Sequence, residues 1–522
     1  MNSLDTPRRG RLQTVPQSNL YEGGINMRKS ICALAAVAAC TLGFNAQAVV
    51  KLEGATANAL EVSESGAGHF LVVPYFTTQS GNALLFSLVN MDEVNGKAVK
   101  MRFRSARNAD TLFDFQVFLA PGDMWTANVS QNSAGLSFLT TADTSCTKPA
   151  KSSLNSTPFQ TERLNSKRTA AARADETREG YIEIVTMADI PPSDKGLYPL
   201  IAANAGTARC ANASGNATWT ALDSNRAGLS DYVALGMQPP SSGLTANWTI
   251  INVPKALSWS GSAFALEARK GGVAALGNLA YFPQVSTTLS NAGTYSADPL
   301  FASAKPRLAA KMSELPDIST PYVSATTDPN QQAKALTSLL EVTTVANEFW
   351  TDAGIVAATD WLFSMPTRRF MLGVDYSAGS SAALVYNSAM GVSQDTLSLS
   401  YWDGESVCDI EPVRSVRDRN GVKSTWADTK EARFNFLCGA TSLYSLRSIA
   451  NKDSGVLGSS VGDGSERSID ISNGWMATSL ESLDGKGLPV IGQAFVRAFN
   501  PSVAPGTAGN FSVTWPHRLL KN

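Results

Sequence analysis

Residues 69–129 read HFLVVPYFTTQSGNALLFSLVNMDEVNGKAVKMRFRSARNADTLFDFQVFLAPGDMWTANV, and this stretch decides the fold class. In Val99–Arg104, apolar residues alternate with basic ones, which is the period-2 pattern of a strand with one buried face and one solvated face. The segment Ala83–Asn90 is largely apolar on both faces and predicts a central strand between two covered layers. Ala120–Asp123 has the Pro and Gly that a tight turn requires. The stretch therefore predicts consecutive antiparallel strands of a β-sandwich.

The first 48 residues have the features of a leader. Residues 1–26 show no apolar periodicity. Residues 27–48 have a basic start, an apolar segment too short to span a bilayer, and a small-x-small cleavage pattern at Ala46–Ala48. We therefore expect residues 1–26 to be a mis-assigned extension, Met27 to be the natural start, and a signal peptide over 27–48 to be removed before Val49. Two alternatives stay open: a translated extension, and a lipoprotein in which Cys40 carries the lipid.

Composition restricts the partners of the chain. With 43 basic and 44 acidic residues the formal net charge is −1, which argues against a surface for nucleic acid or an anionic membrane. After Val49 no stretch approaches the roughly 18 apolar residues of a transmembrane helix. We expect an exported protein, extracellular or on the cell surface of a Gram-negative bacterium. Its partners would be cell-envelope components, glycans or copies of itself, and no cofactor is expected.

Four cysteines remain after the signal peptide. An exported chain meets an oxidising compartment, so we predict two disulfides. Three pairings are open in principle. We favour two local bridges, one within each predicted domain, rather than a metal site, because no Cys-x-x-Cys spacing occurs. The favoured pairs are Cys146 with Cys210, and Cys408 with Cys438.

The second half of the mature chain repeats the β-rich pattern of the first half. Residues 290–327 are rich in Ser, Ala and Pro, so we place a domain junction there and predict domains over 49–294 and 295–522. Asp328-Pro329, followed by apolar residues at helical spacing, predicts a helix. The expected fold class is all-β: tandem antiparallel β-sandwich domains of Ig-like character, with one or two short helices.

One catalytic-looking motif occurs late in the chain. Gly458–Gly462 (GSSVG) matches the nucleophile-elbow pattern, and Asp470, Asp484 and His517 follow in the order of an α/β-hydrolase. An elbow requires a strand before the Ser and a helix after it, whereas both flanks here have the composition of loops. We therefore predict no catalytic residue and a protein that is not an enzyme.

Other candidate residues suit either a site or plain structure. Carboxylates beside apolar segments would suit a glycosidase, but they also serve as helix caps and strand-end charges. Two tryptophans in turn-like contexts would suit stacking on sugars, and three within strands are expected to lie in the core or half-buried in a sheet. A calcium loop over Asp463–Asp470 lacks the full set of oxygen ligands, so no metal site is predicted. The carboxylates are Glu267, Glu341, Asp352, Asp360 and Asp375; the turn tryptophans are Trp259 and Trp402; the strand tryptophans are Trp125, Trp248 and Trp475.

Several segments together resemble a known kind of protein. VPYF (73–76), LLFSLVN (84–90), EGYIEIVTM (179–187), ATDWLFSMPTRRF (358–370) and GLPVIGQAFV (487–496) are similar to a family of secreted or cell-surface β-rich proteins of Gram-negative bacteria. The resemblance covers most of the mature chain. It implies export and Ig-like β architecture, and it carries no activity or catalytic residue to this chain.

Two functions are compatible with these observations. The favoured one is a non-enzymatic surface protein that acts by contact, in adhesion or as part of an envelope coat, because sandwich domains expose loops and sheet edges for binding. The alternative is a secreted hydrolase or glycan-binding protein with a site built from loops.

Overall fold

The computed structural model is built mainly from antiparallel β-sheets, as the sequence predicts. Residues 1–51, which include the predicted extension, the signal peptide and Cys40, lie outside the described residues. The described residues are 52–202, 210, 213–224, 228–284, 295–296, 315–377, 383–394, 400–409, 414–423, 437–448, 455–459, 467–469, 471–481, 485–500, 502–504 and 509–521.

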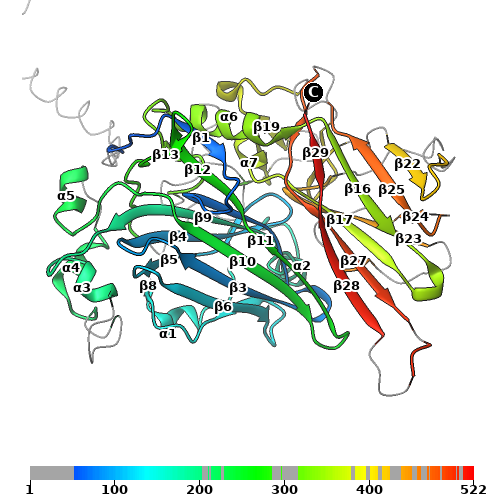
Figure 1. Ribbon diagram of the computed structural model, residues 1–522, viewed down its shortest axis with the longest axis horizontal. Helices are drawn as coiled ribbons and strands as arrows, with labels where there is room; N and C mark the ends of the chain where they lie inside the picture. Colours follow the sequence, from blue (N-terminus) through cyan, green and yellow to red (C-terminus); the bar gives the residue numbers. More distant parts are fainter. Residues whose placement is uncertain are drawn as a thin grey trace, which may run out of the picture. The chain divides into compact units, whose positions relative to one another are not determined.

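Two sheets pack face to face in the first half of the chain and form a β-sandwich. Between them lies a hydrophobic core that includes Met101 and Phe115 from one sheet and Phe86 and Trp125 from the other. The larger sheet contains, in spatial order, β1 (Ala59–Val62), β12 (Phe264–Lys270), β2 (Phe70–Thr77), β9 (Glu179–Ile190), β4 (Gly96–Ser105), β5 (Thr111–Leu119) and β8 (Cys146–Lys148), with β13 (Val273–Ala274) paired to β12. The five-stranded sheet contains β11 (Leu257–Ser262), β10 (Leu244–Asn252), β3 (Asn82–Asn90), β6 (Met124–Gln131) and β7 (Ser137–Thr140), and Figure 1 shows β10, β3 and β6 side by side.

The predicted turn at Ala120–Asp123 has an unexpected role. It joins β5 to β6, but these strands belong to different sheets: β5 pairs with β4 and β8, whereas β6 pairs with β3 and β7. The turn therefore carries the chain from one layer of the sandwich to the other. The chain crosses between the layers several times, with one or two consecutive strands in a layer before each crossing.

The prediction that one face of β4 is solvated is wrong. Lys100, Arg102 and Arg104 are all buried, although they alternate with core residues as expected. The Arg104 guanidinium lies 3.0 Å from a carboxylate oxygen of Glu183 on β9. Arg102 donates a hydrogen bond to the carbonyl of Pro316 at 2.9 Å, because the buried segment around Pro316 covers this face of the sheet. The second face is therefore a layer of paired charges inside the protein, which alternation alone cannot distinguish from a wet face.

The prediction that Ala83–Asn90 lies between two covered layers is also wrong. These residues form β3 in the middle of the five-stranded sheet, and only one side of that sheet is covered. Leu84, Phe86 and Leu88 point into the core, but Leu85 on the other side is 42% exposed. The apolar residues of β3 thus continue onto the surface.

A second pair of sheets forms a sandwich in the second half. Its core includes Phe349 and Met476 from one sheet and Trp361 and Phe363 from the other. β23 and β24 are parallel, whereas the other neighbours of these two sheets are antiparallel. The four-stranded sheet contains β22 (Arg414–Asp418), β25 (Asn473–Ser479), β16 (Thr344–Trp350) and β29 (Arg518–Leu520); the five-stranded one contains β24 (Arg467–Ile469), β23 (Thr441–Ser448), β17 (Ala358–Ser364), β27 (Gln493–Phe499) and β28 (Asn510–Pro516).

The two sandwiches share packing. The face of β17 and β27 that points away from the second core adds Leu362 and Phe495 to the first core. There the Phe495 ring lies 6.0 Å from the ring of Trp248. Residues Val50–Asn522 accordingly group by their contacts into one unit. Most of the predicted junction, namely 290–294 and 297–314, lies outside the described residues. The division into 49–294 and 295–522, like the Ig-like topology, therefore stays a prediction.

Short strands and helices connect the main sheets. The predicted helix is present as α6 (Pro329–Leu340), and the Asp328 side chain caps it by accepting a hydrogen bond from the Asn330 N–H at 2.9 Å. The described residues contain more short helices than the one or two expected. The helices are α1 (Lys151–Leu154), α2 (Ala170–Glu176), α3 (Tyr198–Ile201), α4 (Ala217–Ala221), α5 (Leu229–Val233), α7 (Arg368–Met371), η1 (Gln79–Gly81), η5 (Ala353–Ile355) and η6 (Ser388–Met390); the small sheets are β14 (Tyr295–Ser296) with β18 (Leu372–Asp375) and β19 (Leu384–Tyr386), β15 (Glu341–Val342) with β26 (Leu488–Pro489), and β20 (Tyr401–Trp402) with β21 (Val407–Cys408).

Both disulfides have the pairing that the sequence favours. Cys146 is bonded to Cys210, and Cys408 to Cys438. Each bridge is local, and each lies on one side of the predicted junction. Asp403 lies beside the second bridge, but sulfurs joined in a disulfide are not thiolate ligands, so this group does not form a thiolate metal site.

Candidate contact surface

Of the hydrolase-like candidates, Ser459 and His517 lie among the described residues, and both have structural partners. The Ser459 hydroxyl donates to a carboxylate oxygen of Glu179 at 2.6 Å. Both ring nitrogens of His517 are engaged, Nδ1 with the Asn347 amide at 2.9 Å and Nε2 with the Leu362 carbonyl at 3.0 Å. Ser460, Asp470 and Asp484 lie outside the described residues, as does most of the calcium-loop candidate at 463–470. His517 thus holds strands together and offers no free nitrogen to a serine.

The five candidate carboxylates are also engaged in hydrogen bonds. Each accepts a hydrogen bond from a backbone N–H or a hydroxyl: Asp352 and Asp375 accept from a residue two positions on, as caps do, and the other three accept from segments distant in sequence. In this way the structure distributes them over separate elements and does not bring them together in one cleft. Their donors are the Ser242 hydroxyl for Glu267 at 2.7 Å, and backbone N–H groups for the others: Gly487 for Glu341 at 2.8 Å, Gly354 for Asp352 at 2.7 Å, Leu457 for Asp360 at 2.8 Å and Ser377 for Asp375 at 3.0 Å.

The structure reverses part of the tryptophan assignment. Trp125 and Trp248 are buried, as predicted. Trp259 was a candidate for an exposed sugar platform, but it is buried and its indole N–H donates to the Val496 carbonyl at 2.9 Å. Trp475, which was expected in the core or half-buried in a sheet, is 39% exposed. Trp402 is half-buried.

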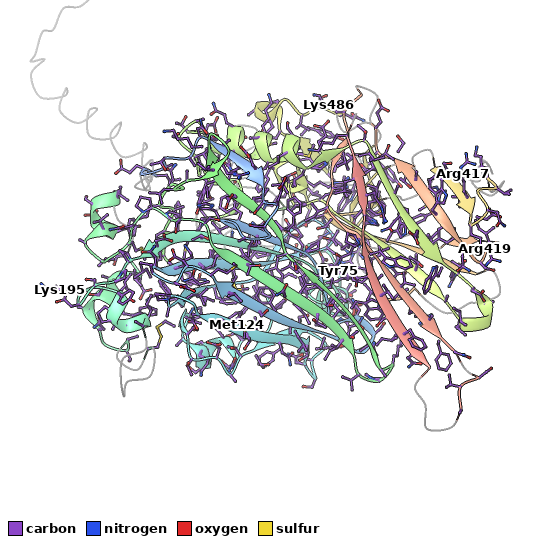
Figure 2. The ribbon with its side chains drawn as sticks, in the orientation of Figure 1. Tyr75, Met124, Lys195, Arg417, Arg419 and Lys486 are labelled. Atoms are coloured by element: carbon purple, nitrogen blue, oxygen red, sulfur yellow. A yellow bond between two sulfur atoms is a disulfide. The ribbon has the colours of Figure 1, made fainter. Side chains whose placement is uncertain are left out.

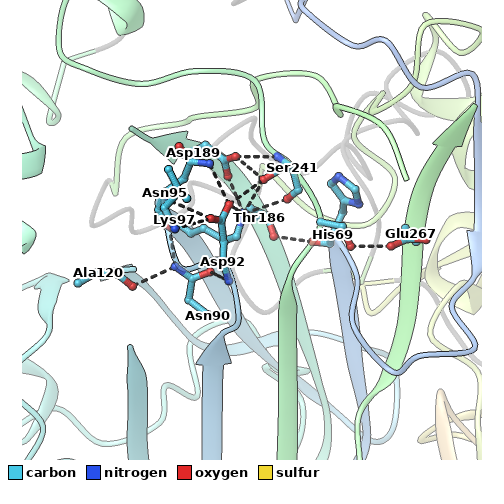
Figure 3. A network of polar contacts seen from close by, with 12 residues as sticks. His69, Asn90, Asp92, Asn95, Lys97, Ala120, Thr186, Asp189, Ser241 and Glu267 are labelled. Carbon is cyan, nitrogen blue, oxygen red and sulfur yellow. Dashed lines mark hydrogen bonds and ion pairs between the residues drawn. The ribbon is translucent and has the colours of Figure 1, made fainter. Parts of the chain in front are cut away.

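A largely buried polar network lies beside one of the two histidines and connects strands and loops at one end of the first sandwich (Figure 3). The Lys97 ammonium donates to Asp189 at 2.7 Å and to the Ser241 carbonyl at 3.0 Å, and Asp92 lies 3.7 Å away. Burial raises the pKa of Asp189, and the Lys97 charge opposes this rise. His69 lies beside the network, and burial followed by the nearby Lys97 charge lowers its pKa to about 3. These groups are enclosed, so the network fastens strands and loops and leaves no open site.

The outer side of the five-stranded sheet β11-β10-β3-β6-β7 carries no charged side chain among the described residues. Alternate residues of each strand point into the core, and the others point outward. Most of the outward residues are Ser, Thr or Asn. We call this surface the neutral face; its residues are Ala83, Leu85, Ser87 and Val89 of β3, Met124, Thr126, Asn128 and Ser130 of β6, Phe138 and Thr140 of β7, Thr245, Asn247, Thr249 and Ile251 of β10, and Ser258, Ser260 and Ser262 of β11.

The middle of the neutral face is hollowed. A depression of ≈ 650 Å³ extends over β3, β6, β7 and β10, and no ionisable side chain lines it. One cross-strand row runs through it from Thr249 to Leu85, Asn128 and Thr140. The row offers hydroxyl and amide groups, which both donate and accept hydrogen bonds, around one apolar side chain. Chemically, the hollow can hold a neutral hydrogen-bonding group but cannot transfer a proton at neutral pH.

The neutral face was not predicted from the sequence, although a signal for it exists. In β10, Thr245, Asn247 and Thr249 alternate with buried residues, and Ser or Thr occupies outward positions of β6 and β11 as well. The absence of charge from all of these outward positions becomes visible only when the strands are placed side by side. Their order in the sheet, with β10 beside β3, is set by contacts between residues distant in sequence.

Comparison of the chain with models of known protein families, with curated proteins and with solved structures finds no match. The resemblance to exported proteins of Gram-negative bacteria therefore stays a hypothesis. No helix within the described ranges is long and apolar enough to cross a membrane.

Proposed function

We propose that this chain is an exported, non-enzymatic protein that acts by contact at the bacterial cell surface, and that the neutral face is its contact surface. The single observation that carries the proposal is an outward-facing five-stranded sheet without a charge. Cores of protein interfaces are depleted in charged residues, because a charge that leaves water without a partner costs free energy.

The shape and chemistry of the neutral face favour a partner that is itself uncharged. Its hydroxyl and amide groups can exchange water for the hydroxyls or amides of a neutral envelope component, and Leu85 and Met124 add exposed apolar area. Because no charge lines the hollow, we expect binding to depend little on salt. Reaction chemistry is not favoured there, because general acid–base catalysis needs a group that titrates near the working pH.

Export and the surface location are parts of the same proposal. They rest on the signal-peptide pattern of residues 27–48. The two disulfides add support, because disulfides persist in oxidising compartments. The alternative of a secreted hydrolase receives no support from Ser459, His517 or the five carboxylates, all of which have structural partners.

The test introduces charge into the neutral face without adding much bulk. Asn247 and Ser260 are both exposed, and the double variant Asn247→Asp/Ser260→Asp puts two carboxylates on this surface. A matched control, Asn58→Asp/Ser152→Asp, makes the same two changes at exposed residues elsewhere. Both variants should export and melt like the wild type. We expect the neutral-face variant to lose about tenfold or more in retention on washed cells, because one unpaired charge at a contact costs more than about 1.4 kcal/mol.

Retention on the same washed cells can also contradict the proposal. If the neutral-face variant stays on the cells as well as the control does, the neutral face is not the contact surface. If a strain without the protein keeps normal attachment and aggregation but loses growth on one polymeric substrate, the protein is an enzyme and the proposal fails.

A further inference from the structure

A second hollow, of ≈ 450 Å³, lies on the outer side of the four-stranded sheet in the second half of the chain. It is separate from the neutral face and is built from a different sheet. Its floor contains Ala346, whose small side chain leaves space beside larger neighbours. Trp350, Trp475 and Arg518 stand around this floor, and we call the hollow the Trp475 groove.

Trp475 packs against a cation of the neighbouring strand. The Arg417 guanidinium lies over its ring, 6.0 Å from the centroid, and also donates a hydrogen bond to the Gly421 carbonyl at 2.8 Å. A second indole, that of Trp350, packs edge-on against Trp515 with ring centroids 5.1 Å apart. Side chains held in this way lose little conformational entropy when a ligand binds, which favours binding.

Polar groups accompany the indoles. Glu348 lies directly opposite Trp475 in the strand register, it is exposed, and its carboxylate accepts no hydrogen bond from the described residues. Asn473 lies opposite Trp350 in the same register. Arg419 also lines the groove, and Figure 2 shows it close to Arg417.

We propose that the Trp475 groove binds an acidic oligosaccharide, that is, a short chain of sugars that carry carboxylates. The flat apolar face of an indole matches the C–H face of a sugar ring, and its N–H provides a polar edge. Glu348 and Asn473 supply the acceptors and donors that sugar hydroxyls need. Arg419 and Arg518 outnumber the single carboxylate in the groove, and guanidinium groups bind carboxylates in a bidentate manner.

The size and charge of the groove also define what it does with the ligand. A volume of ≈ 450 Å³ lies within the range of small-ligand pockets. Glycoside hydrolysis ordinarily uses two carboxyl groups across the scissile bond, whereas Glu348 is the one carboxylate among the residues that line this groove. The groove therefore binds the sugar chain without cleaving it.

The test is a titration of the mature protein with trimers of galacturonic, glucuronic and guluronic acid, with maltotriose as a neutral trimer of the same length. Calorimetry measures affinity, and tryptophan fluorescence reports contact with an indole. We expect at least one acidic trimer to bind about tenfold or more tightly than maltotriose, and Trp475→Ala to weaken that binding by about tenfold or more. Arg419→Gln should weaken the binding of the acidic trimer, and the remaining affinity should depend less on salt concentration than that of the wild type.

A matched variant separates the groove from the alternative tryptophan. Trp402→Ala removes a half-buried indole whose ring lies 6.4 Å from that of Tyr376, away from the groove, and it should bind like the wild type. Three results overturn the proposal: no acidic trimer binds at millimolar concentration, maltotriose binds as tightly as the acidic trimers, or Trp475→Ala binds like Trp402→Ala. None of them depends on the neutral face, so this proposal and the contact function fail separately.

Discussion

Both histidines of the chain are expected to remain neutral well below pH 6. The His517 Nδ1 receives the Asn347 amide, so its proton lies on Nε2 and points to the Leu362 carbonyl. A second proton on Nδ1 would face another donor. His69 is similar at one nitrogen, because its Nδ1 accepts the backbone N–H of Ala268 at 3.0 Å. Burial lowers the pKa of both rings to about 3, and the Lys97 charge contributes at His69.

The shift predicts how stability changes with pH. In the unfolded chain a histidine has a pKa near 6.5. Below that pH the unfolded state binds a proton at this ring, whereas the folded state does not, so protonation favours unfolding. The contribution of each neutral, buried ring to the free energy of unfolding is therefore fully present above pH 6.5. It is lost as the pH falls toward the folded-state pKa of about 3. Between pH 7 and pH 4.5 each ring should lower the free energy of unfolding by about 2–3 kcal/mol, and both together by about 5 kcal/mol.

The assay uses the small number of histidines, of which the chain has 2. Selective ¹⁵N labelling gives one signal set per ring, and both should show the neutral form with the proton on Nε2 at pH 5. Denaturant unfolding at pH 7 and pH 4.5 then compares the wild type with His517→Gln, which should lose about half of the acid dependence. A ring that titrates near pH 6.5, or a variant with the wild-type pH slope, would refute the reasoning.

Three further changes should show what holds the sandwiches together. Lys97→Met leaves the buried Asp189 carboxylate without its cation and should lower the free energy of unfolding by about 3–5 kcal/mol, whereas removing both charges should recover part of the loss; denaturant midpoints measure both. Gly180→Ala places a methyl group against a backbone carbonyl of β4 and should cost about 2 kcal/mol or more in the same assay, while Gly228→Ala, with open space around it, should not. Cys438→Ser opens the second disulfide and should cost about 3 kcal/mol and expose one free thiol, which a thiol titration detects.

Local sequence patterns predicted where strands occur, but they did not predict which side of a strand is covered by other segments. Alternation in Val99–Arg104 identified β4, but it could not show that Arg104 meets Glu183 from a strand far along the chain. An alternating basic residue looks the same whether water or a partner carboxylate faces it. The helix at Pro329–Leu340 was predictable because its cap and its apolar spacing are both local.

The candidate sites illustrate the same limit. Trp259 follows a turn-like segment, yet β11 places it in the shared core, where Val496 from the second half accepts its N–H. Trp475 lies in a strand, yet its side of the sheet faces outward. Which side of a strand is covered depends on contacts between distant segments. Neither the neutral face nor the Trp475 groove was therefore visible before the strands were assembled.

Hydroxyl-radical footprinting of the mature protein on washed cell envelopes tests the central claim most directly. Radicals label exposed side chains, and the neutral face offers Met124, 53% exposed, and Leu85, 42% exposed. Val273 and Val422, each 64% exposed, lie outside the face and serve as internal references. Contact through the neutral face predicts that labelling of Met124 and Leu85 falls on binding while both valines keep theirs. Unchanged labelling of Met124 on fully bound protein would contradict the account.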